Sequence, residues 1–313
     1  MPMVNSSDIN HLWLRLAGFP GADASNHLNL LLSFPLCFLY LLSILGNGII
    51  VFITRVDKQL REPMYLLLSM LAIVDICLTL STLSTTLNVF LFDSTKIHFY
   101  ACLTQLFFIH TLCAMESSIL VAMAFDRYVA ICNPLRYTSI LHPIISKIAL
   151  VALIRCFCLH FPMPFLLKIL PYCDKQTLSY AFCYQIDVTK LACADPTITT
   201  SYSLAVVLTT YPVDAVLILL SYVLIVKTVL GTAKQVERLK VLNTCVSHIC
   251  VVLLFYIPLI TLALVSRYTQ KDSILARFLL GGLLLVVPPA LNPMIYSIKT
   301  RQIRSAIHTK FGT

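Results

Sequence analysis

The amino-acid sequence predicts an all-α membrane protein, a seven-transmembrane helix bundle with a short amphipathic C-terminal helix. Three observations lead to this prediction: 58% of the 313 residues are hydrophobic, 12% are charged, and the mean hydropathy is +0.87. Soluble domains carry about a quarter charged residues, so a water-soluble fold is not expected. Seven spans of roughly 20 apolar residues need about 140 residues, which leaves ample length for loops.

Seven apolar runs, each bounded by charged or turn residues, define the expected helices. They lie near residues 28–54, 63–88, 99–126, 144–168, 200–229, 241–266 and 274–297. The chain has no internal repeat and no linker long enough to separate domains. We therefore expect an N-terminal tail at 1–27, one membrane domain at 28–298 and a cytoplasmic helix and tail at 299–313.

The two ends of the chain have different chemistry. Residues 1–27 lack a central apolar run, so a cleaved signal peptide is not expected. Residues 299–310 place basic side chains among Ile303, Ala306 and Ile307, a pattern that suits a helix lying on the anionic inner leaflet. A merely solvated tail is the alternative. No cysteine follows this stretch, so no palmitoyl anchor is expected.

The distribution of Lys and Arg predicts the orientation. With the N-terminus outside, the inner segments hold 14 of these residues and the outer segments hold eight, the bias that cytoplasmic loops show. Asn5 begins the one N-glycosylation sequon and faces the lumen on this topology. These loops explain the net charge of +9. We therefore expect the lipid bilayer as a partner and no nucleic acid.

Four of the 12 cysteines fall where an oxidising compartment is expected. Cys102 begins the third span on its outer side, and Cys173, Cys183 and Cys193 lie in the long polar connection at 169–199. An even set of four favours disulfides. We expect at least one that ties this connection to the third span, although the sequence leaves three pairings open, and free thiols are the alternative.

Three carboxylates lie inside the predicted spans: Asp75, Glu116 and Asp214. Each costs about 2.5–3.5 kcal/mol on insertion scales. Cys102 and Arg127 are roughly 37 Å apart along a helix at 1.5 Å per residue, so they mark opposite membrane faces. Asp75 and Glu116 then lie near mid-depth and could share a proton, a cation or a water cluster. A satisfied structural contact is the alternative.

A series of short motifs, in order along the chain, resembles the rhodopsin-like G-protein-coupled receptors. They are Gly46-Asn47 in the first span, Leu71-Ala72 with Asp75 in the second, Asp126-Arg127-Tyr128 closing the third, and Asn292-Pro293 with Tyr296 ending the seventh. By this resemblance, Asn47 belongs with Asp75 and Glu116 to a polar or ion site.

More narrowly, the chain resembles the olfactory receptors from about residue 19 to 305. This likeness is carried by Pro63-Met64-Tyr65, the run 123–132 and the run 243–248, and the runs 190–195, 287–289 and 298–304 resemble the class I subgroup. The departures are mild: Phe125 and Val241 stand where the family often has Tyr and Ala. The resemblance implies an odorant receptor at the plasma membrane.

The residues also suit a receptor that switches. Asp126 beside Arg127 can hold the guanidinium at the inner membrane edge, and Pro258 and Pro293 permit kinks. The resemblance implies that activation moves the inner end of the sixth span outward, frees Arg127 and admits a stimulatory G protein that raises cyclic AMP. The residues expected to switch are Asp126, Arg127, Tyr128, Tyr222, Tyr256, Asn292, Pro293 and Tyr296. Interfacial snorkelling of Arg127 and purely structural kinks are the alternatives.

A ligand site is expected between the outer halves of the third, fifth and sixth spans. Its predicted residues are Cys113, Val206, His110, Gln185, Ala263 and Arg267. Class I resemblance implies that Arg267 pairs with a carboxylate-bearing odorant. Alternatively, Arg267 reaches water or pairs with Asp187 or Asp272, and His110 is a wall residue.

Other functions are less well supported. An enzyme is not expected, because no phosphate loop or metal spacing appears, and we expect neither a cofactor nor a metal. An ion-coupled transporter would use intramembrane carboxylates, but it predicts inverted repeats or broken helices. Within the receptor class, a non-olfactory chemoreceptor that senses a metabolite remains open.

Overall fold

The structure, a computed structural model, describes residues 12–17, 26–57, 60, 62–92, 94–134, 137–173, 177–232, 235–268 and 274–311. At several helix ends only the backbone is described: residues 26–30, 32, 138–143, 232, 235–244, 266–268, 274–278, 298, 299, 301 and 311.

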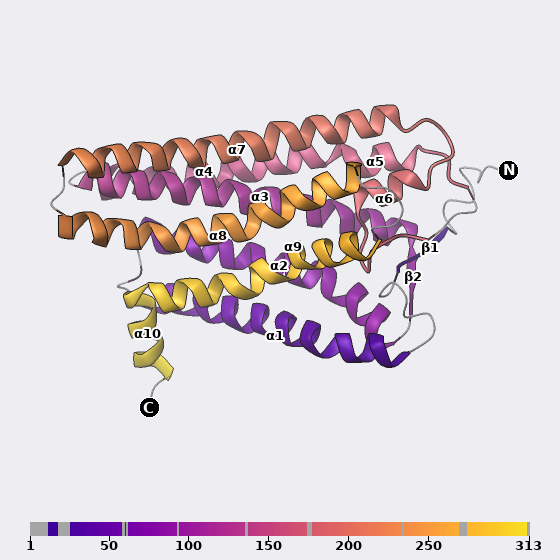
Figure 1. Cartoon of the computed structure of the whole chain (residues 1–313), viewed down its shortest axis with the longest axis horizontal. Helices are drawn as coiled ribbons and strands as arrows, with labels where there is room; N and C mark the ends of the chain where they lie inside the picture. Colours follow the sequence, from indigo (N-terminus) through magenta and orange to yellow (C-terminus); the bar gives the residue numbers. More distant parts are fainter. Residues whose placement is uncertain are drawn as a thin grey trace.

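Seven long helices run side by side along the length of the molecule (Figure 1). They are α1 (Asn26–Val56), α2 (Pro63–Leu91), α3 (Phe99–Cys132), α4 (Tyr137–His160), α7 (Thr197–Thr232), α8 (Gln235–Tyr268) and α9 (Ile274–Lys299). Within the described ranges, seven stretches are long and apolar enough to cross a membrane, the fourth of them continuing into α5 (Pro162–Lys168). The predicted count of seven spans is confirmed.

Prolines lie at the start of α2 and inside α8 and α9. Pro63 opens α2 directly after Glu62, whose backbone is extended, because a helix leaves its first amides unpaired in any case. Pro258 lies inside α8, and Pro288, Pro289 and Pro293 lie inside α9. Each removes a backbone donor from the helix interior, which is where kinks form.

The short elements lie at the two ends of the bundle. β1 (Trp13–Arg15), β2 (Lys96–His98) and α6 (Gln185–Lys190) gather at one end, called the loop end below, and α10 (Arg301–Phe311) turns away from the other, the α10 end (Figure 1). β1 pairs antiparallel with β2, with Trp13 opposite His98. The two strands were not predicted, and β1 falls within the stretch expected to be a tail.

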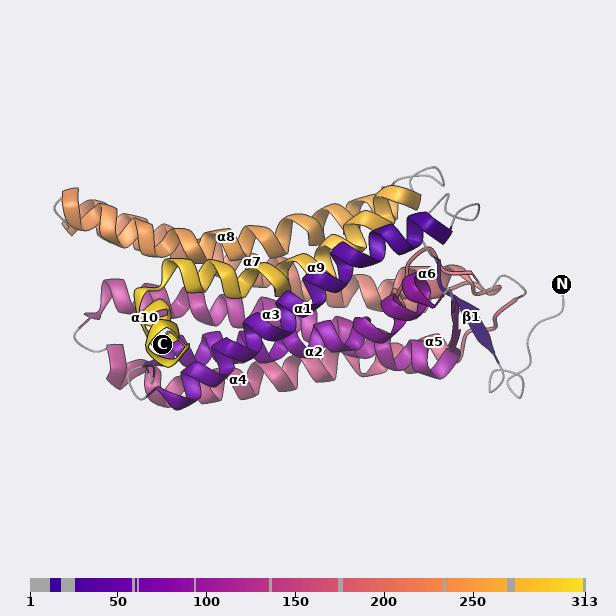
Figure 2. The ribbon, with the colours of Figure 1, turned by 90° about the horizontal axis from the view of Figure 1, so that it is seen from below.

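The α10 helix lies where the amphipathic C-terminal helix was predicted. Its Ile303 and Ala306 are buried against the bundle, while Arg304 and Lys310 are exposed. Figure 2 shows α1 running obliquely across the bundle beside α9 and α2. Gly46 makes this approach close: a Cβ atom added there would lie 2.9 Å from the Cβ of Pro293.

Two disulfides close the loop end. One joins Cys102 to Cys183, with 5.4 Å between the Cα atoms, and the other joins Cys173 to Cys193, with 5.8 Å. This is one of the three pairings that the sequence left open, and it ties the long connection to the start of α3, as expected.

Candidate functional site

A cavity of about 200 Å³ lies between α3, α7, α8 and α9 and is covered by the loop before α6. One water needs roughly 10–15 Å³ of such space, so the cavity can hold a small organic molecule. Its wall is largely apolar. The lining residues are Ile109, His110, Cys113, Phe182, Tyr184, Val207, Tyr211, Pro212, Leu259, Ile260, Leu262, Ala263, Leu264, Leu284 and Leu285.

His110 brings a polar atom to this wall. Its Nε2 is buried and has no hydrogen-bond partner among the described residues. The imidazole stacks between the rings of His160 and Tyr184, at centroid distances of 6.1 Å and 6.0 Å. The ring is therefore held in place while one nitrogen stays available, an arrangement that suits hydrogen bonding to a ligand.

The lid of the cavity is the loop that carries Phe182 and Tyr184. The disulfide at Cys183 anchors it to α3, and the Cys183 amide donates to Oε1 of Gln105 at 2.9 Å. The Ser179 amide donates to Asp187 at 2.6 Å. The first bond fixes the lid at the disulfide, and the second joins the residues before and after it.

The strand β1 holds the same lid from above. The Leu178 amide donates to the Arg15 carbonyl at 2.8 Å, and the Ala17 amide donates to the Tyr180 carbonyl at 3.2 Å. Leu14 and Leu16 are buried beneath the strand, whereas Trp13 and Arg15 face outward. Sequence reasoning missed this strand, although its alternating apolar and outward residues are the period-two signal of a half-buried strand.

The residues predicted to bind ligand fall into two groups where their side chains are described. His110, Cys113 and Ala263 line the cavity. Gln185 and Val206 do not; their neighbours Tyr184 and Val207 line it instead, and the Gln185 amide donates to Thr189 at 3.2 Å.

Two predicted residues cannot be compared in this way. Arg267 lies in the last turn of α8, but its side chain is outside the described residues, as is the whole of Asn5.

A charged network crosses the bundle on the α10 side of the cavity. Arg155 on α4 pairs with Asp214 on α7 at 2.8 Å and also donates to Ser118 at 2.8 Å. Ser117 on α3 donates to Asp214 at 2.7 Å and lies 2.9 Å from the Tyr256 hydroxyl on α8. Four helices are thereby joined through one buried carboxylate.

This network lies one helical turn from the cavity. Ser117, Asp214 and Tyr256 are each three or four residues from a cavity-lining residue on the same helix, and one turn is 3.6 residues, or 5.4 Å. Sequence reasoning noted Asp214 and Tyr256 but did not join them to Arg155. The available signal was one basic and one acidic residue inside separate spans, since such residues pair with one another.

A second polar cluster lies between α1, α2, α3 and α9. The Asn292 amide donates to Oδ2 of Asp75 at 3.0 Å and also interacts with Glu116. Asn47 donates to the Pro289 carbonyl at 2.8 Å. Oδ1 of Asp75, Oε1 of Glu116 and Oδ1 of Asn292 are buried without partners among the described residues. Such oxygens can accept a shared proton, a cation or water.

The Asp126-Arg127-Tyr128 motif lies at the α10 end of α3. Nε of Arg127 is 3.9 Å from Asp126, whose other oxygen accepts a hydrogen bond from Tyr137 at 2.8 Å. Tyr128 packs between α3 and α7, against Ile225 and its neighbours. Burial, together with the Asp126 carboxylate, raises the pKa of Tyr137, so this phenol stays protonated and continues to donate.

The predicted tyrosine partners lie around Arg127. Tyr222 on α7 and Tyr296 on α9 are both within electrostatic range of its guanidinium. The Tyr222 hydroxyl bonds Nδ1 of His248 on α8, and the Tyr296 hydroxyl contacts the Met123 sulfur at 3.8 Å. Pro293 lies one turn before Tyr296 in α9. The α10 ends of α3, α7, α8 and α9 thus meet at this arginine.

The seven-helix bundle, its lidded cavity and its buried polar clusters define a seven-helix membrane protein. The fold is similar to that of squid rhodopsin, with a TM-score of 0.74 at 18% sequence identity, covering 95% of this chain and 90% of that one.

Residues 36–312 match the olfactory receptor family model. Human olfactory receptor 51G2 is 47% identical over 98% of this chain and 97% of its own length, and human olfactory receptor 51E2 is 44% identical over 98% and 96%. The chain belongs to the olfactory receptor family. It is a multi-pass membrane receptor rather than an enzyme, and its partners are a small-molecule ligand and a G protein.

Proposed function

We propose that the chain is an odorant receptor of the plasma membrane that binds a small odorant in the cavity beneath Phe182 and Tyr184 and activates a stimulatory G protein, raising cyclic AMP. The observation that carries this proposal is the position of the cavity one helical turn from the Arg155–Asp214 network. A ligand that shifts α3, α7 or α8 in the cavity must also move a member of this network.

The network supplies a physical route from ligand to G protein. Ser117 and Tyr256 are linked by a 2.9 Å contact between α3 and α8, and α8 carries Pro258 two residues later. A change at Tyr256 therefore acts beside the helix position where bending costs least. Bending at Pro258 moves the α10 end of α8, where His248 contacts Tyr222.

At the α10 end, activation breaks the resting contacts of Arg127. Asp126 holds the guanidinium at 3.9 Å, and Tyr137 holds Asp126. Outward movement of α8 separates His248 from Tyr222, which lets Tyr222 and Tyr296 reorganise around Arg127. A G protein then enters the groove that opens beside Tyr128.

The cluster of Asn47, Asp75, Glu116 and Asn292 takes part as a polar or ion site. It joins α2, α3 and α9 near mid-depth, and Asn292 immediately precedes Pro293. A proton or cation shared by Asp75 and Glu116 stabilises the resting arrangement, since two carboxylates close together repel each other when both are ionised. Its loss on activation frees Asn292 to move with α9.

The ligand is a compact molecule with an apolar body and one polar group. The apolar wall holds the body, and His110 Nε2 offers a hydrogen bond. Arg267, at the loop end of α8, is the counter-ion for a carboxylate head group, since charge-assisted pairs of this kind are short and strong. Ala263 is one turn away and offers no hydrogen bond.

The loop end faces the outside of the cell. Both disulfides lie there, and disulfides persist in oxidising compartments. The exposed basic residues of α10 then meet the anionic inner leaflet.

The test is a dose–response screen in cells that report cyclic AMP, with surface display measured in parallel. Matched series of aliphatic acids, alcohols and esters are applied to the wild type, His110→Ala and Arg267→Ala, with Arg304→Ala on exposed α10 as the matched control for losing an arginine. We expect a response to acids that His110→Ala weakens and Arg267→Ala abolishes. Acid responses that survive Arg267→Ala contradict the counter-ion assignment, and silence of a displayed wild type contradicts the coupling.

A further inference from the structure

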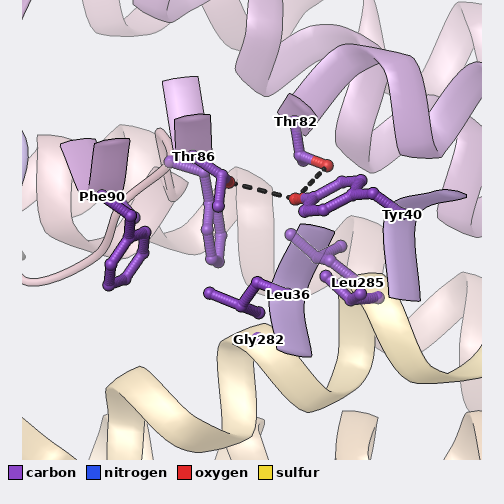
Figure 3. Close-up of a pocket in the computed structure, with 10 residues that line it drawn as sticks. Leu36, Tyr40, Thr82, Thr86, Phe90, Gly282 and Leu285 are labelled. Atoms are coloured by element: carbon purple, nitrogen blue, oxygen red, sulfur yellow. Dashed lines mark hydrogen bonds between the residues drawn. The ribbon is translucent and has the colours of Figure 1, made fainter. Parts of the chain in front are cut away.

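A second, smaller cavity of about 50 Å³ lies between α1, α2, α9 and the lid loop. Figure 3 shows its side chains coming from three helices, among them Leu36, Phe90 and Leu285. Because one water needs roughly 10–15 Å³ of such space, this cavity has room for a few non-hydrogen atoms. The function proposed above makes no use of it.

The polar groups beside this cavity already bond one another. The Tyr40 hydroxyl lies 3.1 Å from the Thr82 hydroxyl and 3.0 Å from that of Thr86, as the dashed lines in Figure 3 show. The Thr82 hydroxyl also donates to the carbonyl of Leu78 in its own helix. A polar occupant would have to displace these bonds, whereas an apolar one leaves them intact.

The two cavities share a wall. Phe182 from the lid and Leu285 from α9 line both of them. Phe182 packs directly on the α9 backbone, because a Cβ added at Gly281 would lie 3.0 Å from its ring. Leu285 is also buried, at 3% exposed, but a leucine side chain can change between staggered rotamers. The shared wall therefore includes one side chain seated on the α9 backbone and one that moves aside by a change of rotamer.

Gly282 leaves free space beside the small cavity. A Cβ added at Gly282 meets nothing within 4 Å, and Gly282 lines the small cavity but not the large one. A larger residue at this position therefore meets no steric obstacle, and it borders the small cavity rather than the large one.

We propose that the small cavity is a subsite for the terminal carbons of unbranched aliphatic ligands, and that Phe182 and Leu285 set the chain length at which it is used. This rests on the proposed function only in placing the ligand in the larger cavity. Short chains fill the larger cavity alone. Longer chains displace the Leu285 side chain and extend toward Gly282.

The experiment compares straight-chain acids and alcohols of increasing length on the wild type, Gly282→Leu and Leu285→Ala. Two signals are recorded: the cyclic AMP response in cells and the ligand-dependent rise in Tm of purified receptor in detergent. Gly48→Leu is the matched control for a leucine placed in open space at a helical glycine. Leu68→Ala is the control for core truncation, because Leu68 and Leu285 are both 3% exposed and Leu68 lines neither cavity.

Gly282→Leu is expected to leave short chains unaffected and to weaken long ones by about fourfold for each methylene beyond the wall, the factor that burying one CH₂ contributes. Leu285→Ala is expected to shift the preferred chain length upward, whereas Leu68→Ala and Gly48→Leu are expected to leave it unchanged. An unchanged length profile in Gly282→Leu, or the same upward shift in Leu68→Ala, overturns the subsite.

The two signals separate the subsite from G-protein coupling. A length-dependent rise in Tm that Gly282→Leu truncates, without any cyclic AMP response, supports the subsite and counts against the coupling. A wild type whose Tm no chain length raises overturns the subsite.

Discussion

At the scale of single residues, the Arg155–Asp214 pair joins α4 to α7 inside the bundle. Asp214 is almost fully buried, with a side-chain exposure of 2%, whereas Arg155 keeps 33% of its side chain exposed. Removing one partner of a buried pair leaves an uncompensated charge, while removing both does not. Replacing one residue of the pair is therefore expected to destabilise the protein more than replacing both.

Asp214→Leu is expected to lower stability by about 3 kcal/mol, the lower end for a broken buried pair, because Arg155 retains some exposure. The measurement is the Tm of purified receptor, together with surface display in cells. The double variant Arg155→Leu with Asp214→Leu is the control and should recover most of the loss. A double variant as unstable as the single one would contradict the pairing argument.

Ser117 tests whether the network transmits the signal. Ser117→Ala removes the hydroxyl that contacts both Asp214 and Tyr256, and one such bond contributes about 1 kcal/mol. We expect normal surface display with a changed maximal cyclic AMP response. Ser221→Ala is the matched control, since that hydroxyl bonds only its own helix and is exposed. Equal responses from the two variants would remove Ser117 from the proposed route.

At the scale of elements, the position of α1 depends on its close approach to α9. A Cβ at Gly46 would meet Pro293 at 2.9 Å, a separation at which the helices must shift. Asn47, the next residue, donates to the Pro289 carbonyl across the same contact. The first helix is thus fixed beside the proline-containing part of α9, where the proposed switch operates.

Gly46→Ala is expected to push α1 away from α9 and to reduce both Tm and surface display. Gly48→Ala, two residues along the same helix, has open space at its Cβ and should be neutral or stabilising, since alanine favours a helix over glycine by about 1 kcal/mol. Thermal melting of the two purified variants distinguishes them. If the two variants have the same Tm, the close contact between Gly46 and Pro293 does not determine the stability of the bundle.

The strand β1 is the second element whose role can be tested. Leu14 is 1% exposed beneath the strand, so Leu14→Ala should cost about 2–5 kcal/mol, as core truncations do, and should weaken odorant responses by loosening the loop at Tyr180. Trp13→Ala, on the half-exposed side of the same strand, is the control. The measurements are Tm and dose–response curves. Equal losses of stability and response in the two variants would show that inward packing of β1 is unimportant.

At the scale of the whole molecule, the proposed orientation rests on the charge bias and the disulfides. With the loop end outside, an N-terminal tag should be stained on intact cells and Asn5 should carry a glycan. Asn5→Gln should increase gel mobility as much as enzymatic deglycosylation of the wild type does. Staining only after permeabilisation would reverse the proposed topology.

The sequence alone determined the class of this protein. Seven apolar stretches, their order and the series of motifs predict the bundle and its family, because insertion into a bilayer depends on local composition over roughly 20 residues. It also identified Cys102 and the three loop cysteines, because an even set in an oxidising compartment favours disulfides. It identified the intramembrane carboxylates, because ionisable groups are costly inside a bilayer.

Only the tertiary structure decided which of these residues meet. It chose the disulfide pairing, joined Arg155 to Asp214, and placed Tyr184 and Val207 rather than Gln185 and Val206 on the cavity wall. The physical reason is rotation: neighbouring helical residues point about 100° apart at 3.6 residues per turn, so the wall depends on how each helix turns as it packs. The division of the site by Phe182 and Leu285 likewise arises only when a loop and a distant helix come together.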